Sequence, residues 1–152
     1  LEALKLFAVA LEQVASGKHL EAIPFYKKAL EAIEISRMPL PDGKIGHAEL
    51  KIGDSRIMLS DECPEMKAIS PQALGGSPIS LVLYVENVDV IAKKMIDAGA
   101  KVIKPVADQF YGDRMGSFID PFGHQWTIST HIEDVSDEEC KIRFEKMIQE
   151  NQ

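Results

Sequence analysis

The feature that most constrains the fold is a succession of helix and strand signals that occurs twice along the chain. In the first half, an amphipathic stretch from about His19 to Ala32 precedes alternating apolar and polar residues over 47–60. In the second half, an amphipathic stretch from about Asp89 to Ala98 precedes a hairpin pattern over 117–129. A chain that alternates in this way is expected to build a sheet covered by helices on one side.

A weak internal repeat supports a duplicated unit. One common offset without gaps places Lys27 on Lys93 and Pro39 on Pro105, and a small further gap superposes the two hairpins. Two copies of a βαβββ unit account for this pattern. The first copy needs an opening strand, which we expect near Leu4–Leu11 from the architecture alone, because that segment fits a helix equally well.

The predicted fold class is therefore α+β, with two tandem βαβββ modules in a single domain. Module one is expected at about 4–62 and module two at about 77–131. A C-terminal helix is expected at about 136–149, because Ser136 followed three residues later by Glu139 forms a capping box.

The composition restricts the partners and the compartment. The 152 residues contain 17 Lys and Arg against 24 Asp and Glu, with a pI near 5.1. This acidic balance argues against a nucleic acid or an anionic membrane as partner. No apolar run approaches the ~20 residues that span a bilayer. Cys63 and Cys140 form no paired motif, so reduced thiols and a cytoplasmic location are expected.

Several motifs, taken together and in their order, resemble one superfamily. They include "AIPFYKKAL", "MPLPDGKIGHAELKIGDSRIMLSDE", "LYVENVD" and "DAGAKVIKPVADQFYGDRMGSFIDPFGHQWTISTHIEDVSDEE". The stretch that they cover, roughly 18–140, resembles the vicinal oxygen chelate superfamily of glyoxalases, bleomycin-resistance proteins and extradiol dioxygenases. Within it, the PhnB-like branch is the most similar.

The resemblance implies that each module curls its sheet into a half-barrel, with the helix outside and a ligand cavity on the concave side. Polar residues that alternate with apolar ones along a strand then acquire two interpretations. His47 and Glu49 are ligand-binding candidates if their face lines the cavity. Alternatively, they form an ordinary solvated or internally paired strand face.

The resemblance also implies one divalent metal, held by His, Gln and Glu side chains from the first and last strands of each module. Alignment of that scheme gives the following residues at the four positions: Leu11, Met58, Ser80 and Thr127. A shift by two residues on the opening strands gives Gln13 and Val82, which recovers at most one ligand. Hydrocarbon, thioether and neutral hydroxyl groups are poor ligands for such ions. We therefore predict no intrinsic metal and no cofactor.

The connection "PVADQFYGDRMG" provides further ligand-binding candidates, and Thr127 is expected beside the same cavity. Phe110, Tyr111 and Arg114 combine aromatic rings with a guanidinium, which suits a planar or anionic ligand. The alternative is that Arg114 pairs with Asp113 at the surface while the two rings cover the mouth of the barrel.

Two classes of function remain open. The first is a metal-free module that binds a small organic molecule, anionic or aromatic, in the manner of the bleomycin-resistance proteins. The second is a lyase, isomerase or dioxygenase that holds a metal differently or uses His47 or Glu49 as a general base. No catalytic residue is assigned. A homodimer is expected, because a half-barrel exposes strand edges that a neighbour must cover.

Overall fold

The computed structural model describes residues 11–14 and 19–150. Module one comprises β1 (Leu11–Val14), α1 (His19–Ala29), β2 (Ile33–Pro39), β3 (Ile45–Ile52) and β4 (Ser55–Asp61). Module two comprises β5 (Ser80–Tyr84), α3 (Val88–Asp97), β6 (Lys101–Asp108), β7 (Asp113–Ile119) and β8 (Gln125–His131). A 3-10 helix η1 (Pro64–Met66) and a short helix α2 (Pro71–Leu74) connect the modules, and α4 (Asp137–Glu150) follows them.

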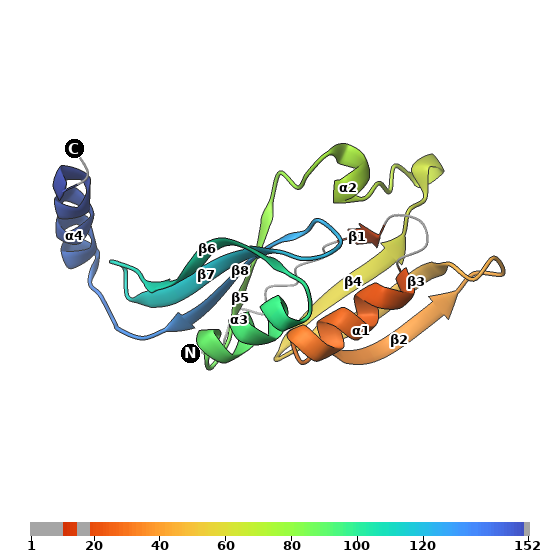
Figure 1. The fold of residues 1–152 in the computed structure, drawn as a ribbon, viewed down its shortest axis with the longest axis horizontal. Coiled ribbons are helices and arrows are strands. Elements are labelled where there is room, and N and C mark those ends of the chain that lie inside the picture. The colour runs from red at the N-terminus through yellow and green to blue at the C-terminus, as the bar shows by residue number, and fades with distance from the viewer. Residues whose placement is uncertain (1–10, 15–18, 151–152) are drawn as a thin grey trace.

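The two sheets have the same topology, which confirms the predicted fold class. Their strand orders are β1-β4-β3-β2 and β5-β8-β7-β6. In each sheet the first and last strands of the module pair in parallel, and the other neighbours are antiparallel. Both sheets are curled and neither closes into a barrel (Figure 1). The C-terminal helix also forms, and the Ser136 hydroxyl accepts the backbone N–H of Glu139 at 3.3 Å.

Two strand predictions need correction. The opening strand was expected near Leu4–Leu11, whereas β1 runs from Leu11 to Val14 and residues 4–10 lie outside the described part of the chain. The predicted long connection around residues 105–116 is mostly strand, because β6 continues to Asp108 and β7 begins at Asp113. Pro105 is tolerated within β6 because β6 is an edge strand with a register shift at this point.

The helices α1 and α3 lie side by side against the two sheets (Figure 1). The alternation predicted for β3 is confirmed, because Ala48, Leu50 and Ile52 are buried while the residues between them are not. The core contains the apolar residues of both helices and of the covered sheet faces, including Ile23, Tyr26, Leu50, Leu59, Met95, Phe118, Trp126 and Ile128. We call the opposite side of each sheet, which bears His47 in module one and Thr127 in module two, its open face.

A buried carboxylate joins the two modules. Asp120, which is 3% exposed, lies in the turn between β7 and β8. Its Oδ2 accepts the Tyr26 hydroxyl of α1 at 2.8 Å and the Trp126 indole N–H at 2.9 Å. Its Oδ1 accepts the backbone N–H groups of Phe122 and His124 at 2.9 and 3.0 Å. One side chain therefore fixes the turn of module two and connects it to the helix of module one.

We predict that Tyr26→Phe lowers the free energy of unfolding by about 1–3 kcal/mol, because a buried carboxylate loses one of its donors. Tyr111→Phe is a matched control. The Tyr111 hydroxyl contacts the Met115 sulfur at the surface, so its loss is expected to cost less than about 1 kcal/mol. Urea denaturation of both variants measures the difference. Equal effects of the two substitutions would contradict the special role of Asp120.

Candidate functional site

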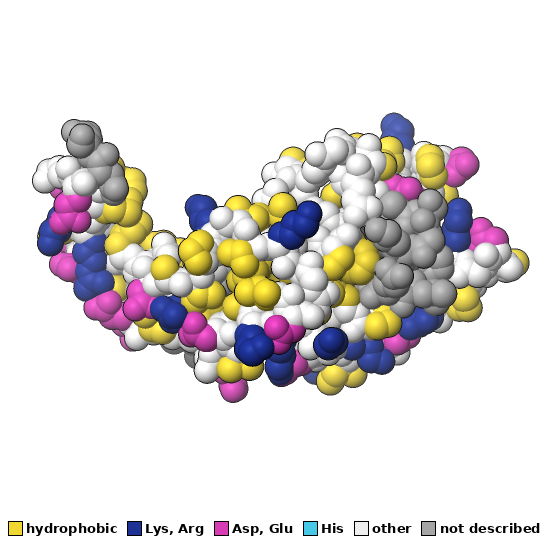
Figure 2. All heavy atoms as spheres, in the orientation of Figure 1, with side chains coloured by type: hydrophobic (Ala, Val, Ile, Leu, Met, Phe, Trp, Pro, Cys, Tyr) yellow, Lys and Arg dark blue, Asp and Glu magenta, His cyan; other side chains and the backbone are white. Residues whose placement is uncertain are grey.

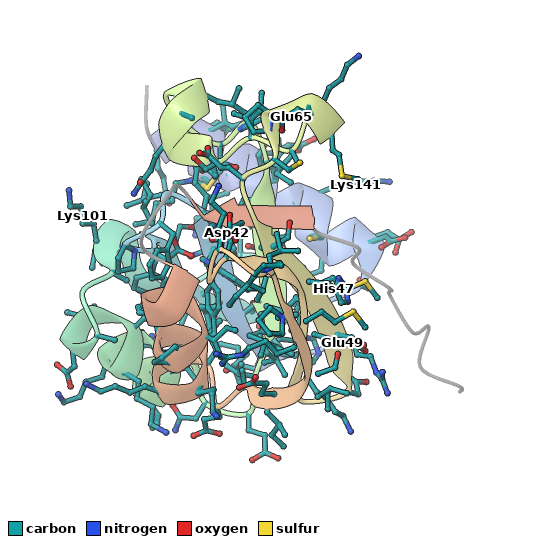
Figure 3. The ribbon with its side chains drawn as sticks, turned by 90° about the vertical axis from the view of Figure 1, so that its right-hand side faces the viewer. Asp42, His47, Glu49, Glu65, Lys101 and Lys141 are labelled. Atoms are coloured by element: carbon teal, nitrogen blue, oxygen red, sulfur yellow. The ribbon has the colours of Figure 1, made fainter. Side chains whose placement is uncertain are left out.

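The open face of module one carries charged side chains at its centre. His47 and Glu49 lie on β3, and both point away from α1 (Figure 3). Glu49 forms an ion pair with Arg56 of β4. The predicted alternation therefore brings His47 and Glu49 to one face, although Glu49 already has a partner within the sheet.

A cavity of about 690 Å³ lies beside His47 at one end of module one. The turn between β2 and β3, the end of β4 and the segment around η1 form its walls. Its polar lining includes Lys44, Ser60, Asp61 and Cys63. Asp61 is buried, and its Oδ2 accepts the backbone N–H of Ile45 at 2.6 Å, which fixes the start of β3. This volume falls in the range of small-molecule pockets.

The open face of module two carries neutral hydroxyl groups at its centre. The Thr127 hydroxyl lies 3.2 Å from that of Ser80 and 3.3 Å from that of Ser117. Three neighbouring strands, β5, β8 and β7, contribute these groups. Thr127 is thus on the open face, and its hydroxyl lies within hydrogen-bond distance of two others in the sheet.

The residues at the superfamily's metal positions do not provide a suitable donor set. The Cα of Leu11 is paired with that of Met58, and Val82 is paired with Thr127. These residues supply hydrocarbon, a thioether and a neutral hydroxyl, whereas Zn²⁺, Ni²⁺ and Fe²⁺ prefer imidazole, thiolate and carboxylate. In the part of the chain that the structure describes, no group of three or more His, Cys, Asp or Glu side chains could hold a metal ion.

The aromatic pair lies in the turn between β6 and β7. The rings of Phe110 and Tyr111 meet edge to face at 5.1 Å, and Phe110 also packs on Phe144 of α4 at 5.4 Å. The Tyr111 hydroxyl donates to the sulfur of Met115 at 2.9 Å. The pair therefore connects the end of module two with the C-terminal helix, and Tyr111 remains partly exposed.

Arg114 does not join the other predicted site residues. Alternation along β7 turns its side chain toward the helix side, where it donates two hydrogen bonds to Asp89 of α3 at 2.8 and 2.9 Å. A third, of 2.8 Å, reaches Asp108. These bonds hold the pKa of Asp89 below its usual range. The expectation that Arg114 points into the cavity is therefore wrong, and so is the alternative that it pairs with Asp113.

Asp113 instead forms the centre of a second polar group at the end of the open face of module two. Its Oδ2 accepts the Tyr84 hydroxyl at 2.5 Å and the Ser129 hydroxyl at 3.3 Å. Its Oδ1 lies 3.0 Å from Nδ1 of His131, and Nε2 of that ring lies 2.9 Å from Asp134. Strands β5, β7 and β8 bring these residues together.

The pKa values reflect these contacts. Burial raises the pKa of Asp113, but hydrogen bonds from Tyr84, His131 and Ser129 outweigh it, so the pKa lies below its usual range. Hydrogen bonds to Asp113 and then to Asp134 raise the pKa of His131. The pKa of His124, in the β7–β8 turn, is instead lowered, because burial disfavours the protonated ring.

Residues 13–128 match the model of the Glyoxalase/Bleomycin resistance protein/Dioxygenase superfamily, and the chain belongs to this superfamily. The Mycobacterium bovis protein Mb0911c is 42% identical over 123 residues, which cover 79% of this chain and 81% of that protein. The predicted superfamily is therefore confirmed.

Solved structures of other proteins have a similar fold. TioX from Micromonospora sp. ML1 superposes with a TM-score of 0.63 and 21% identity, covering 82% of this chain and 99% of that one. The PhnB protein from Bacillus cereus gives 0.59 and 17%, covering 80% and 98%. No helix in the described part of the chain is both long and apolar enough to cross a membrane. Cys63 and Cys140 are free thiols.

Sequence reasoning missed the group around Asp113 and His131. The predicted hairpin pattern ended at residue 129, whereas β8 extends to His131 and pairs it with Asp113. The signal that could have located it is the alternation Gln125, Thr127, Ser129, His131, which continues past the predicted strand end.

We predict that protonated His131 stabilises the fold. Its pKa is raised above 6.5, the value expected in the unfolded chain. Its contribution is therefore complete below about pH 6.5 and is lost as the pH rises through the folded-state pKa. The stability difference between wild type and His131→Gln across this range isolates the effect, because His124 is present in both proteins.

Asp113→Asn should lower the pKa of His131 in an NMR titration, since it removes the larger of the two causes of the shift. Asp134→Asn should lower it less. An unchanged pKa in Asp113→Asn would contradict the hydrogen bond from His131 to Asp113.

Proposed function

We propose that this protein is a homodimeric module of the PhnB-like branch that binds a small organic molecule on its open faces without a metal ion. The observation that carries the proposal is the cavity of about 690 Å³ beside His47, since its volume suits a small ligand. Its lining combines apolar surface with an imidazole, a lysine ammonium and a hydroxyl, and such groups orient a bound molecule by hydrogen bonds.

The donor chemistry favours binding over metal-dependent catalysis. The resemblance to the superfamily aligns Met58 and Thr127 with positions where its enzymes place nitrogen or carboxylate ligands, and a thioether and a neutral hydroxyl are poor substitutes. No step of a metal-assisted reaction can be derived from these side chains. The superfamily includes bleomycin-resistance proteins as well as enzymes, and a binding module is consistent with that range.

A second copy of the chain is proposed to cover the open faces. Large apolar side chains are exposed there, including Ile33 and Met38 in module one and Val82 and Tyr84 in module two. Figure 2 shows hydrophobic side chains on the outline between α4 and α2, where the molecule is hollowed. Helix α4 adds three more exposed apolar side chains, Ile142, Phe144 and Ile148. Apolar surface of this kind typically marks an interaction site.

The absence of a functional metal is tested by thermal unfolding. We expect that neither chelator treatment nor added Zn²⁺ or Ni²⁺ changes the melting temperature, because a ligand stabilises a protein only through its affinity for the native state. Stoichiometric metal that remains after dialysis against a chelator would contradict the proposal and would favour the enzyme interpretation.

The dimer is tested by sedimentation velocity at micromolar concentration, where we expect a single species of twice the chain mass. Val82→Lys and Ile33→Lys should weaken the association, because each places a charge on an exposed apolar position. Val90→Lys is a matched control, since Val90 is exposed on α3, away from the open faces. A compact wild-type monomer would remove the dimer from the proposal.

A further inference from the structure

The imidazole of His131 lies between two carboxylates with very different surroundings. Asp113, on the Nδ1 side, has a side chain that is 8% exposed. Asp134, on the Nε2 side, is fully exposed and lies in the segment between β8 and α4. The His131 ring itself is half-exposed at the end of the open face. One nitrogen therefore faces the protein and the other faces solvent.

The bond on the protein side is fixed. Asp113 also accepts the hydroxyls of Tyr84 and Ser129, so three side chains hold its position. A carboxylate in this position orients the ring and favours its doubly protonated form, in which both nitrogens donate. When it is protonated, His131 thus presents a positioned N–H donor at the open face.

The bond on the solvent side is exchangeable. An ion pair between exposed groups contributes little, because water and salt screen it and the side chain loses freedom when it forms. Asp134 is such a group, and it is fully exposed where it contacts Nε2 of His131. Another oxyanion can therefore take its position at Nε2 with little loss.

An aromatic side chain shares the Asp113 carboxylate with this donor. Tyr84 donates to Asp113, and its pKa is raised by that hydrogen bond, with a further contribution from nearby Tyr111. Tyr111 stacks edge to face on Phe110 at the adjacent turn. Partly exposed rings beside a cationic donor are suited to a flat molecule that carries a negative charge.

We propose that His131 binds the carboxylate of a small aromatic ligand, with a ligand oxygen replacing the Asp134 carboxylate at Nε2. This inference rests on the proposed function, ligand binding on the open faces, and it assigns the chemical class of ligand at a second position, the end of module two, apart from the cavity beside His47. It also revises the sequence-based expectation, because Arg114 lies on the helix side of β7, whereas His131 lies on the open face. The titratable groups that face the ring are Asp113 of β7, Tyr84 of β5, and Asp134, with Tyr111 beside them.

Benzoate is the probe, and its uncharged analogue benzyl alcohol is the comparison. Binding is followed by the NMR shifts of the His131 ring and by titration calorimetry at about pH 6, where the imidazolium is populated. We expect His131→Gln to weaken benzoate binding by about tenfold or more, because a charge-assisted hydrogen bond is lost. Affinity in the wild type should also fall as the pH rises through the pKa of His131.

Asp134→Ala is the more specific test. It removes a competing carboxylate, so benzoate should bind about two- to fivefold more tightly. Glu138→Ala is the matched control, because it removes an exposed acidic group nearby on α4 without touching His131. Arg114→Gln removes a cation from the other face of β7 and should leave benzoate affinity within about twofold.

The inference is overturned if folded wild-type protein shows no benzoate-dependent shift of His131. It is also overturned if Asp134→Ala fails to tighten binding, or if benzyl alcohol binds as well as benzoate. If His131→Gln does not fold, the affinity of Asp134→Ala and the pH dependence of wild-type binding test the inference. These results are separate from the proposed function, since a ligand can bind in the cavity beside His47 whether or not His131 binds a carboxylate.

Discussion

The arrangement of the two modules depends on the carboxylate of Asp120. Four donors from two modules converge on this buried side chain, and Tyr26 among them comes from a helix far away in the sequence. Burying a carboxylate is unfavourable unless its oxygens are fully hydrogen-bonded, and Asp120 meets this requirement only when α1 lies against the β7–β8 turn. The rings of Tyr26 and Trp126, 5.7 Å apart, pack beside it. This contact aligns the helices on one side and leaves both open faces on the other.

The duplicated topology provides two open faces with different chemistry. Module one places the imidazole of His47 and the Glu49–Arg56 ion pair at its centre. Module two places hydroxyls there, with Asp113 and His131 at one end. Because strand order and helix packing depend on the covered faces, the open faces have been free to differ. Both open faces therefore present positioned polar groups, although no three His, Cys, Asp or Glu side chains among the described residues could hold a metal ion.

The sequence predicted the elements that have strong local signals. Amphipathic periodicity located α1 and α3, alternation located β3 and β4, and the capping residues Ser136 and Glu139 located α4. It did not predict which face Arg114 occupies, because that depends on where β7 begins. Successive residues of a strand point to opposite sides. Phe118 of β7 packs in the core, and because β7 extends back to Asp113, alternation turns Arg114 to the helices and Asp113 to the open face. The role of His131 likewise depends on β8 extending to its pairing with Asp113.

The central claim is that the open faces bind an organic molecule without a metal ion. Native mass spectrometry of the purified protein, followed by denaturation of the same sample, tests it most directly. We expect the native mass to equal two chains plus an organic molecule of low mass that is released on denaturation, with no mass attributable to a metal. A single chain that carries one equivalent of Zn²⁺, Ni²⁺ or Fe²⁺ and no organic molecule would contradict it.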